Sequence, residues 1–339
     1  MATKSRTEQS KHRHVLLPMM KGGRLGFITS DGEERVTSQF TGLNGSFRVF
    51  YAISVRSQRE GLAPVKVGDV WGYIDTDGKV AINPQFEEAG AFQEGLAPVQ
   101  INNKWGYIDH SGALVINAFF EQVGPFSEGL AAVREQNLWG FIAKDGTFAI
   151  RPQFDEVAGG RWVAPEHPER VHGHFSEGHC AVRIGGKWGF IEKSGKFVIN
   201  PQFDAVASFY EGLAAAQSGE AWGFIDKKGD FVVNPQFDDA GGFGDGLAPV
   251  KSGGKWGYID KKGSYVAYPQ FEDADSFFDG MAAVKLDGRW GFIGTDGKYS
   301  IVPQFDEVGS FEYGIAPVRT DQGWGYLDKE GSYVLTPTS

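Results

Sequence analysis

A short motif recurs along this chain with a fixed period, and that period constrains the fold more than any other feature. Neighbouring Trp-Gly dipeptides lie 34 residues apart, except for one interval of 49, and Leu25-Gly26 forms a ninth, degenerate copy. The eight tryptophans are Trp71, Trp105, Trp139, Trp188, Trp222, Trp256, Trp290 and Trp324. Units of this length bury their apolar faces only by stacking on neighbours. We therefore predict one continuous array of nine repeats instead of two or three unrelated domains.

Each repeat contains three short runs with strand character. The copy from Gly246 to Phe271 reads G-L-A-P-V, then W-G-Y-I-D, then an apolar run that ends in P-Q-F. β-Branched and aromatic residues dominate these runs, and a D-x-x-G segment typical of a hairpin turn separates the second from the third. No run of ten or more residues has helical periodicity. The sequence predicts an all-β fold built from nine three-stranded antiparallel meanders.

The repeats are expected to start near residues 15, 61, 95, 129, 178, 212, 246, 280 and 314. Together they form a single array over 15–339, with insertions near 41–55 and 157–174 and a disordered N-terminal tail at 1–14. The first copy carries Val15, Leu25 and Ser38 in place of Gly, Trp and Pro, as a capping repeat would. This favours an open superhelical solenoid whose 41–55 insertion covers the N-terminal edge. A closed β-propeller-like ring is the alternative.

The repeated aromatic residues are expected to form the core. We predict that each tryptophan fills the space between adjacent repeats and that the phenylalanine of P-Q-F adds a second layer. Stacked platforms for sugars or peptides are the less favoured reading of the same spacing. Cys180 stands where other copies have Ala63 or Ala97, which indicates a buried position and not a nucleophile.

The repeat unit also resembles a known family. The copy from Lys255 through Val284 is similar to the WG-repeat (KWG-repeat) proteins of bacteria, and the resemblance extends over residues 15–339. It implies a β-rich interaction array without an assigned chemistry.

Composition excludes several classes of protein. The 43 acidic and 33 basic residues give a net charge of −10, which disfavours nucleic-acid binding. A single cysteine excludes a disulfide framework, and no apolar stretch reaches the ~18 residues that span a membrane. The N-terminus has no signal-peptide pattern. We expect a cytoplasmic monomer with no membrane or nucleic-acid partner. Catalytic motifs such as G-x-S-x-G and H-E-x-x-H are absent, so no enzymatic activity and no cofactor are predicted.

The 157–174 insertion breaks the period and gathers unusual residues. They are Trp162, His167, His172 and His174, with His179 just beyond. A loop that contacts a partner or ligand is the favoured interpretation; a metal site and an enzyme site are alternatives. His179 stands at a repeated leucine position, where it needs a polar partner or water.

Acidic residues also follow the period. One set follows P-Q-F and comprises Glu87, Glu121, Asp155, Asp204, Asp238, Glu272 and Asp306. A second set precedes G-L-A and comprises Glu60, Glu94, Glu128, Glu177, Glu211, Asp245 and Asp279. Stacking in register predicts acidic ladders along one rim. These acids either pair between repeats with the basic residues that follow L-A-P-V, or form a groove that steers a basic partner. The basic residues are Lys66, Arg134, Arg183, Lys251, Lys285 and Arg319. On the second interpretation, the first acidic set binds the partner.

Taken together, these features favour a non-catalytic protein-binding scaffold. One version is an inhibitor or immunity-type protein that masks its partner. A carbohydrate- or cell-envelope-binding module is the alternative.

Overall fold

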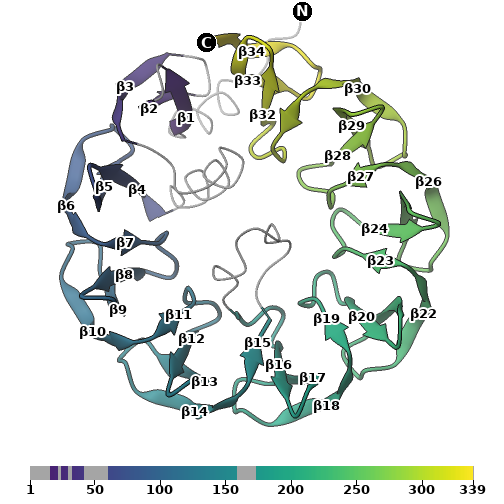
Figure 1. The fold of residues 1–339 in the computed structure, drawn as a ribbon, viewed down its shortest axis with the longest axis horizontal. Coiled ribbons are helices and arrows are strands. Elements are labelled where there is room, and N and C mark those ends of the chain that lie inside the picture. Colours follow the sequence, from purple (N-terminus) through teal and green to yellow (C-terminus); the bar gives the residue numbers. More distant parts are fainter. Residues whose placement is uncertain (1–15, 22–23, 30–32, 42–59, 159–172, 339) are drawn as a thin grey trace, which may run out of the picture.

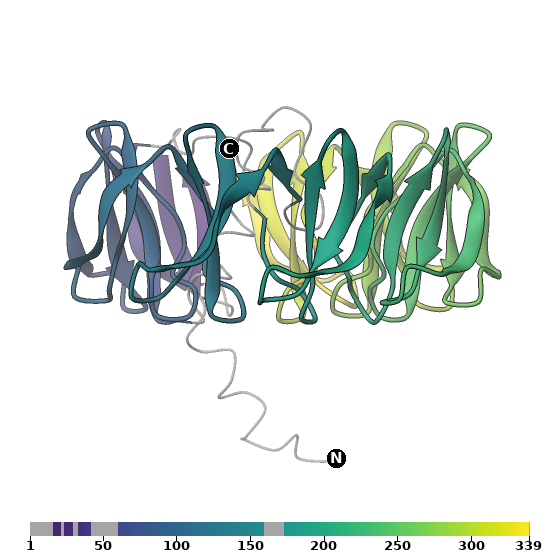
Figure 2. The same ribbon diagram turned by 90° about the horizontal axis from the view of Figure 1, so that it is seen from below.

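The computed structural model describes residues 16–21, 24–29, 33–41, 60–158 and 173–338. These residues form nine small antiparallel sheets, each built from consecutive strands and arranged as the blades of a closed ring (Figure 1). The strands run along the axis of the ring, and their connections gather at its two ends (Figure 2). The expected open solenoid is therefore wrong, and the ring that was the alternative is what the chain forms. No helix among the described residues is long and apolar enough to cross a membrane.

Among the described residues, blades 1 and 2 have three strands and blades 3 to 9 have four, ordered from the centre of the ring outward. The innermost strands are β7 (Glu88–Ala89), β11 (Gln122–Val123), β15 (Glu156–Val157), β19 (Ala205–Val206), β23 (Asp239–Ala240), β27 (Asp273–Ala274) and β31 (Glu307–Val308). The next strands outward are β1 (Leu16–Lys21), β4 (Leu62–Val67), β8 (Ala97–Ile101), β12 (Leu130–Glu135), β16 (Cys180–Ile184), β20 (Ala214–Ser218), β24 (Leu247–Ser252), β28 (Met281–Leu286) and β32 (Ile315–Thr320).

The Trp-Gly strands follow, and the P-Q-F strands lie at the perimeter. The former are β2 (Arg24–Thr29), β5 (Val70–Asp75), β9 (Lys104–Ile108), β13 (Leu138–Ala143), β17 (Lys187–Ile191), β21 (Ala221–Ile225), β25 (Lys255–Asp260), β29 (Arg289–Gly294) and β33 (Gly323–Asp328). The latter are β3 (Glu34–Phe40), β6 (Val80–Phe86), β10 (Leu114–Phe120), β14 (Phe148–Phe154), β18 (Phe197–Phe203), β22 (Phe231–Phe237), β26 (Tyr265–Phe271), β30 (Tyr299–Phe305) and β34 (Tyr333–Thr338).

The three-stranded meander was thus predicted correctly, but the inner strand was not. That strand has only two residues, directly after P-Q-F, and it pairs with the strand that follows it, as Glu88 with Gln100. Two residues are too few to give a periodic signal in the sequence.

The glycine of each Trp-Gly pair is required by a close approach of two strands. In blade 7 a Cβ on Gly257 would lie 2.6 Å from the Ala267 carbonyl oxygen and 2.7 Å from the Pro269 nitrogen. The register shifts here, because Trp256 pairs with Phe271 while Tyr258 pairs with Ala267. The P-Q segment is therefore a bulge in the outer strand, and a bulge with a proline blunts an exposed sheet edge.

Tryptophans and phenylalanines fill the space between blades, as predicted. Between blades 7 and 8, Trp256, Tyr258 and Phe271 form one buried cluster with Phe277 and Val284. Trp71, Trp139 and Trp290 are also buried in such clusters, whereas Trp105, Trp188, Trp222 and Trp324 are half-buried. The tryptophans thus belong to the core and do not form an exposed platform.

Blades 1 and 9 close the ring with the same kind of contact that joins interior blades. Leu17, Met19 and Ile28 of blade 1 share a buried cluster with Ile315 and Tyr326 of blade 9. The degenerate first copy does not act as an end cap, because Leu25 is fully buried in the cluster between blades 1 and 2. An apolar residue in the tryptophan position was sufficient to keep that blade stacked on both sides.

A tyrosine hydroxyl marks several of these joints. Tyr107 donates to the Gly124 carbonyl oxygen of the next blade at 2.6 Å. Tyr326 in blade 9 also donates to a carbonyl oxygen of the following blade, that of Pro18 in β1, at 2.5 Å. The closing joint therefore also has a tyrosine hydrogen bond, although its acceptor lies in the strand β1 and not in an inner connection.

Candidate interaction surface

The ends of the strands define two faces of the ring. One end carries the inner connections, such as Gln93–Leu96, together with the D-x-x-G turns. We call this end the connection face. The opposite end carries the tight hairpins, such as the turn at Asn102 and Asn103, and is called the hairpin face. Because the meander reverses at each turn, the two sets of repeated acids lie on opposite faces. The expected alignment of both sets along one rim is therefore wrong.

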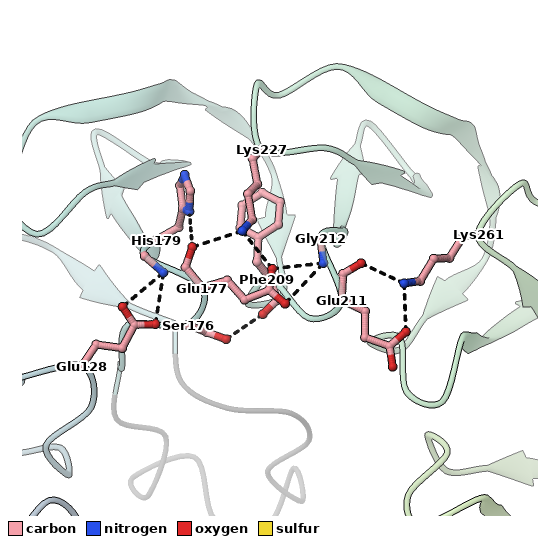
Figure 3. Close-up of polar contacts among 10 residues, drawn as sticks. Glu128, Ser176, Glu177, His179, Phe209, Glu211, Gly212, Lys227 and Lys261 are labelled. Atoms are coloured by element: carbon pink, nitrogen blue, oxygen red, sulfur yellow. Dashed lines mark hydrogen bonds and ion pairs between the residues drawn. The ribbon is translucent and has the colours of Figure 1, made fainter.

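On the connection face, each acid of the set that precedes G-L-A joins two blades. The Glu177 carboxylate accepts the Gly212 N–H of the next blade at 3.0 Å and pairs with the Lys227 ammonium at 3.1 Å (Figure 3). Lys227 also donates to the Glu177 carbonyl oxygen at 3.3 Å. The same contact of carboxylate with glycine N–H recurs for Glu60, Glu94, Glu128, Glu211, Asp245 and Asp279.

A cation completes this contact between two blades, and we call the acid, the glycine N–H and the cation together the clasp. The cation comes from the D-x-x-G turn of the next blade. Lysines fill the role at Lys144, Lys193, Lys227, Lys261 and Lys329, and His110 lies 3.6 Å from the Glu60 carboxylate. Thr295 stands at the corresponding place opposite Asp245. These acids thus pair with cations of the neighbouring repeat, but the cations come from the turns and not from the predicted positions after L-A-P-V, such as Lys66 and Arg134.

The clasp also sets the charge state of Glu128. Partial burial raises the pKa of this carboxyl, but the Gly178 N–H and the Lys193 ammonium outweigh that effect. The net result is a pKa below the ordinary value of 4.5, so Glu128 is held as an anion.

On the hairpin face, acids of the set that follows P-Q-F cap backbone turns. The Glu87 carboxylate accepts the Asn102 and Asn103 N–H groups at 3.0 and 2.8 Å. Turn N–H groups are held in the same way by Glu121, Asp155, Asp204, Asp238 and Glu272, and Asp306 pairs with Arg289. The pKa of Asp204 is lowered, chiefly by its hydrogen bond from Lys187. All seven acids thus have structural contacts, and their predicted role in binding a partner remains a prediction.

The histidine-rich insertion begins at the inner end of blade 5. Trp162, His167 and His172 lie outside the described residues, as do most residues of the 41–55 insertion. The flanking Ala158 donates its N–H to the Ala181 carbonyl oxygen, as Gly90 does to that of Pro98 in blade 3. The insertion therefore replaces a short connection at the centre of the ring.

The two described histidines of this group, His174 and His179, have different polar partners. His174 lies 3.5 Å from the Tyr210 hydroxyl, whereas His179 Nδ1 lies 2.9 Å from the Glu177 carbonyl oxygen, with its ring beside Phe209 (Figure 3). The polar partner expected for His179 is thus that carbonyl. Within the described ranges, no three His, Cys, Asp or Glu side chains are arranged to hold a metal ion. Cys180 is buried in the core, and burial raises the pKa of its thiol.

The outer edge of blades 7 and 8 carries a surface that the sequence reasoning missed. The Tyr268 side chain is 72% exposed and that of Val302 is 60% exposed. Both stand in a position that is polar in the seven other blades, as Thr37, Asn83, Asn117, Arg151, Asn200, Asn234 and Thr336. The Tyr268 ring stacks on that of Tyr265 with centroids 5.2 Å apart, and Tyr299 is 41% exposed. We call Tyr265, Val266, Tyr268, Tyr299 and Val302 the rim patch. Comparison of the copies at this position would have revealed it.

The ring and its blades define the class of protein, a closed, nine-bladed β-propeller. The model of the WG-containing repeat matches residues 71–105, 105–139, 139–159, 170–188, 188–220, 222–256, 256–290 and 290–323. The chain therefore belongs to the family of WG-containing repeat proteins.

Solved structures with similar architecture share little sequence with this chain. A eukaryotic initiation factor is 10% identical, with a TM-score of 0.61 over 96% of this chain and 97% of that chain. Citrobacter koseri AztD is 12% identical, with a TM-score of 0.45 over 96% and 95%. The dihydro-heme d1 dehydrogenase NirN is 11% identical, with a TM-score of 0.48 over 94% and 76%. No curated protein matches the sequence. The likeness to the initiation factor shows a shared fold alone.

Proposed function

We propose that this protein is a non-catalytic scaffold that binds another protein through the outer edge of blades 7 and 8. The observation that carries the proposal is the rim patch, where exposed tyrosine and valine replace the polar residues of other blades. Tyrosine is enriched at protein interfaces because it offers a large apolar surface together with a hydroxyl group. Contiguous exposed apolar residues of this kind mark interaction sites on soluble proteins.

The repeated polar residues support this location indirectly. The acids of both faces are engaged in clasps and turn caps, so they are structural in every blade where they are described. A partner that binds at one particular place on the ring must contact residues that differ from blade to blade. Tyr268 and Val302 are such features, and they lie on adjacent blades.

The test uses substitutions that the repeat itself has already accepted. Tyr268→Asn with Val302→Asn restores the residue found at Asn83 and Asn234, so the fold should be retained. A partner recovered in stoichiometric amount by affinity purification from the source cells would be purified, and its Kd measured by titration calorimetry. We expect the double variant to weaken binding at least tenfold, as loss of interface aromatics does. Val232→Asn is the matched control, because Val232 is 48% exposed on the outer edge of blade 6.

Two results would contradict the proposal. One is the absence of any stoichiometric protein partner across growth conditions. The other is a partner whose Kd is the same for the wild-type protein and the double variant, which would place the contact elsewhere on the ring.

The histidine-rich insertion supplies a separate test of the earlier prediction for Trp162, His167 and His172. Deleting residues 159–173 joins Ala158 to His174 and leaves a connection as long as that of blade 3. We expect this shortened protein to fold and to lose affinity if the loop contacts the partner. Unchanged affinity would remove the loop from the binding surface.

A carbohydrate-binding module is the second candidate, and the stacked Tyr265 and Tyr268 rings favour it. The exposed Tyr268 ring, stacked on the half-buried Tyr265, offers an apolar surface, and neighbouring Gln270 offers an exposed amide. Binding of the purified protein to a glycan array, lost in Tyr268→Asn, would support this function. No binding across the array would exclude it for the glycans presented.

A further inference from the structure

The outer edge of blade 3 differs in sequence from the outer edges of the other blades. Its outermost strand, β10, ends in A-F-F where most copies end in P-Q-F. Ala118 stands in the position of the proline, and Phe119 stands in that of the glutamine. Blade 1 keeps the glutamine and blade 9 keeps the proline, so blade 3 is the one copy in which both are replaced.

The proline and the glutamine both limit pairing at an outer edge. In four blades the glutamine amide donates to the carbonyl oxygen two residues earlier on the same strand, as Gln236 does to Asn234 at 3.3 Å. Proline has no N–H group, and native proteins use it to blunt sheet edges. Phe119 has no polar group that could cover the Asn117 carbonyl oxygen, and Ala118 keeps its N–H. The main chain of β10 is therefore less protected against pairing with another strand than that of the other outer strands.

Exposed apolar side chains accompany this edge at the perimeter of the ring (Figure 1). Leu114, Val115 and Phe119 are 41%, 46% and 48% exposed. The Phe119 ring packs on that of the buried Phe120, with centroids 4.1 Å apart. We call residues 114–119 the blade 3 edge. An exposed apolar edge strand is a template for pairing with a strand of another chain.

The stretch around the blade 3 edge carries no charge. Residues 111–120 include no acidic or basic side chain, and Ala113 stands where every other copy has a polar or charged residue. Those residues are Glu33, Lys79, Thr147, Lys196, Asp230, Ser264, Lys298 and Ser332. The chain as a whole has a net charge of −10, so two copies repel each other. An uncharged edge allows two copies to approach without bringing like charges together.

A strand of identical sequence complements this edge. Antiparallel pairing about a two-fold axis at Asn117 would place Val115 opposite Phe119 of the other copy, and the symmetry would repeat that pair. Pairs of aromatic and β-branched residues stabilise antiparallel strands. Segments without charge or proline and with high β-propensity are also the kind that pair with their own copies. Sequence and symmetry thus point to a second copy of the chain as the occupant of this edge.

We propose that the blade 3 edge pairs with the same edge of a second copy and forms a two-fold symmetric dimer. Two strands of this length bury on the order of 1,000 Å² in total, at the low end for specific interfaces, so the dimer is weak and its Kd is micromolar. The monomer expected from the sequence is then the dissociated form at low concentration. The rim patch lies on blades 7 and 8, on the other side of the ring from blade 3, and stays accessible in the dimer (Figure 1).

Sedimentation equilibrium of the full-length protein over a concentration series tests the dimer. Ala118→Pro with Phe119→Gln restores the residues of six other copies, so the ring should be retained. We expect the wild-type protein to shift from monomer to dimer with concentration, and the double variant to raise the Kd of the dimer at least tenfold. The rim patch variant, Tyr268→Asn with Val302→Asn, is the control and should leave this Kd unchanged. A wild-type protein that stays monomeric, or an equal Kd in the double variant, would overturn the proposal.

Cross-linking tests the register separately. Asn117→Cys places a thiol at the two-fold axis, where paired strands bring the two Cα atoms within about 5.5 Å of each other. We expect this variant to form disulfide-linked dimers under mild oxidation, whereas Asn234→Cys, at the same position in blade 6, should stay monomeric. The native Cys180 is buried and does not compete. Equal cross-linking of the two variants would overturn the pairing. Neither measurement involves a partner protein, so both outcomes are independent of the proposed function.

Discussion

The hydrogen bond that closes the ring allows a direct test of the architecture. Tyr326 is 1% exposed, and its hydroxyl donates to the Pro18 carbonyl oxygen across the joint between blades 9 and 1. Tyr326→Phe keeps the ring of the side chain and removes only this donor. Depriving a buried polar group of its partner costs about 1–3 kcal/mol. Because 1.4 kcal/mol is a tenfold change in an equilibrium, opening of the joint should become roughly 5- to 150-fold more frequent.

Hydrogen exchange measured by mass spectrometry distinguishes a ring from an open array. In a ring, Tyr326→Phe should speed exchange in β1 and β2 as well as in blade 9, although Pro18 is 308 residues away in sequence. Tyr107→Phe is the control, because Tyr107 donates to a carbonyl oxygen of the next blade, that of Gly124, at 2.6 Å inside the array. That variant should affect blades 3 and 4 only. If Tyr326→Phe leaves β1 and β2 unchanged while Tyr107→Phe has its local effect, the reasoning about closure is refuted.

Three further outcomes follow from the geometry. Gly257→Ala should destabilise the protein by about 1–3 kcal/mol in urea unfolding, since its Cβ would lie 2.6 Å from the Ala267 carbonyl oxygen. Gly294→Ala should be nearly neutral, because its Cβ would meet only flexible side-chain atoms. Equal effects of the two substitutions would contradict the argument from close approach of the strands. Trp256→Ala should cost about 3–5 kcal/mol and speed exchange in blades 7 and 8 together, and a loss confined to blade 7 would mean that the tryptophan does not join the blades. Glu128 has a lowered pKa in the folded state, so its contribution to stability is present above about pH 4.5 and is lost as the pH falls through the folded-state pKa. Glu128→Gln should therefore make the free energy of unfolding depend less on pH below about 4.5. An unchanged pH dependence would mean that the clasp does not contribute to acid unfolding.

Sequence periodicity was sufficient to predict the local structure but not its closure. The strands around Trp256, the turn glycines and the buried phenylalanines all follow from patterns within one repeat. Closure depends instead on the small rotation from each blade to the next, summed over nine copies, and no single residue encodes that sum. Val15, Leu25 and Ser38 suggested a cap because they depart from the consensus, yet Leu25 fills the tryptophan position well enough for the blade to stack on both sides.

The candidate site was predicted less well, for a related reason. The two acidic sets were correctly expected to align between copies, but their placement on one rim ignored the reversal of the chain between them. Glu87 lies where an outer strand ends, and Glu94 lies beyond the two-residue inner strand, at the opposite end of the blade. Tyr268 and Val302 were missed because the prediction relied on residues that recur in every repeat. These two residues stand out only by comparison with the polar residues at the same position in other blades.

This division between repeated and unrepeated residues explains how such a ring can recognise one partner. A contact made by every blade presents nearly the same surface at each position around the ring, so a partner bound through it could dock in several equivalent orientations. The clasps and turn caps are of this kind, and their contacts stabilise the ring. Orientation requires residues that occur once, and Tyr268 and Val302 break the equivalence on two adjacent blades. The regular residues thus build the ring, and under the proposed function the irregular ones determine where on that ring a partner binds.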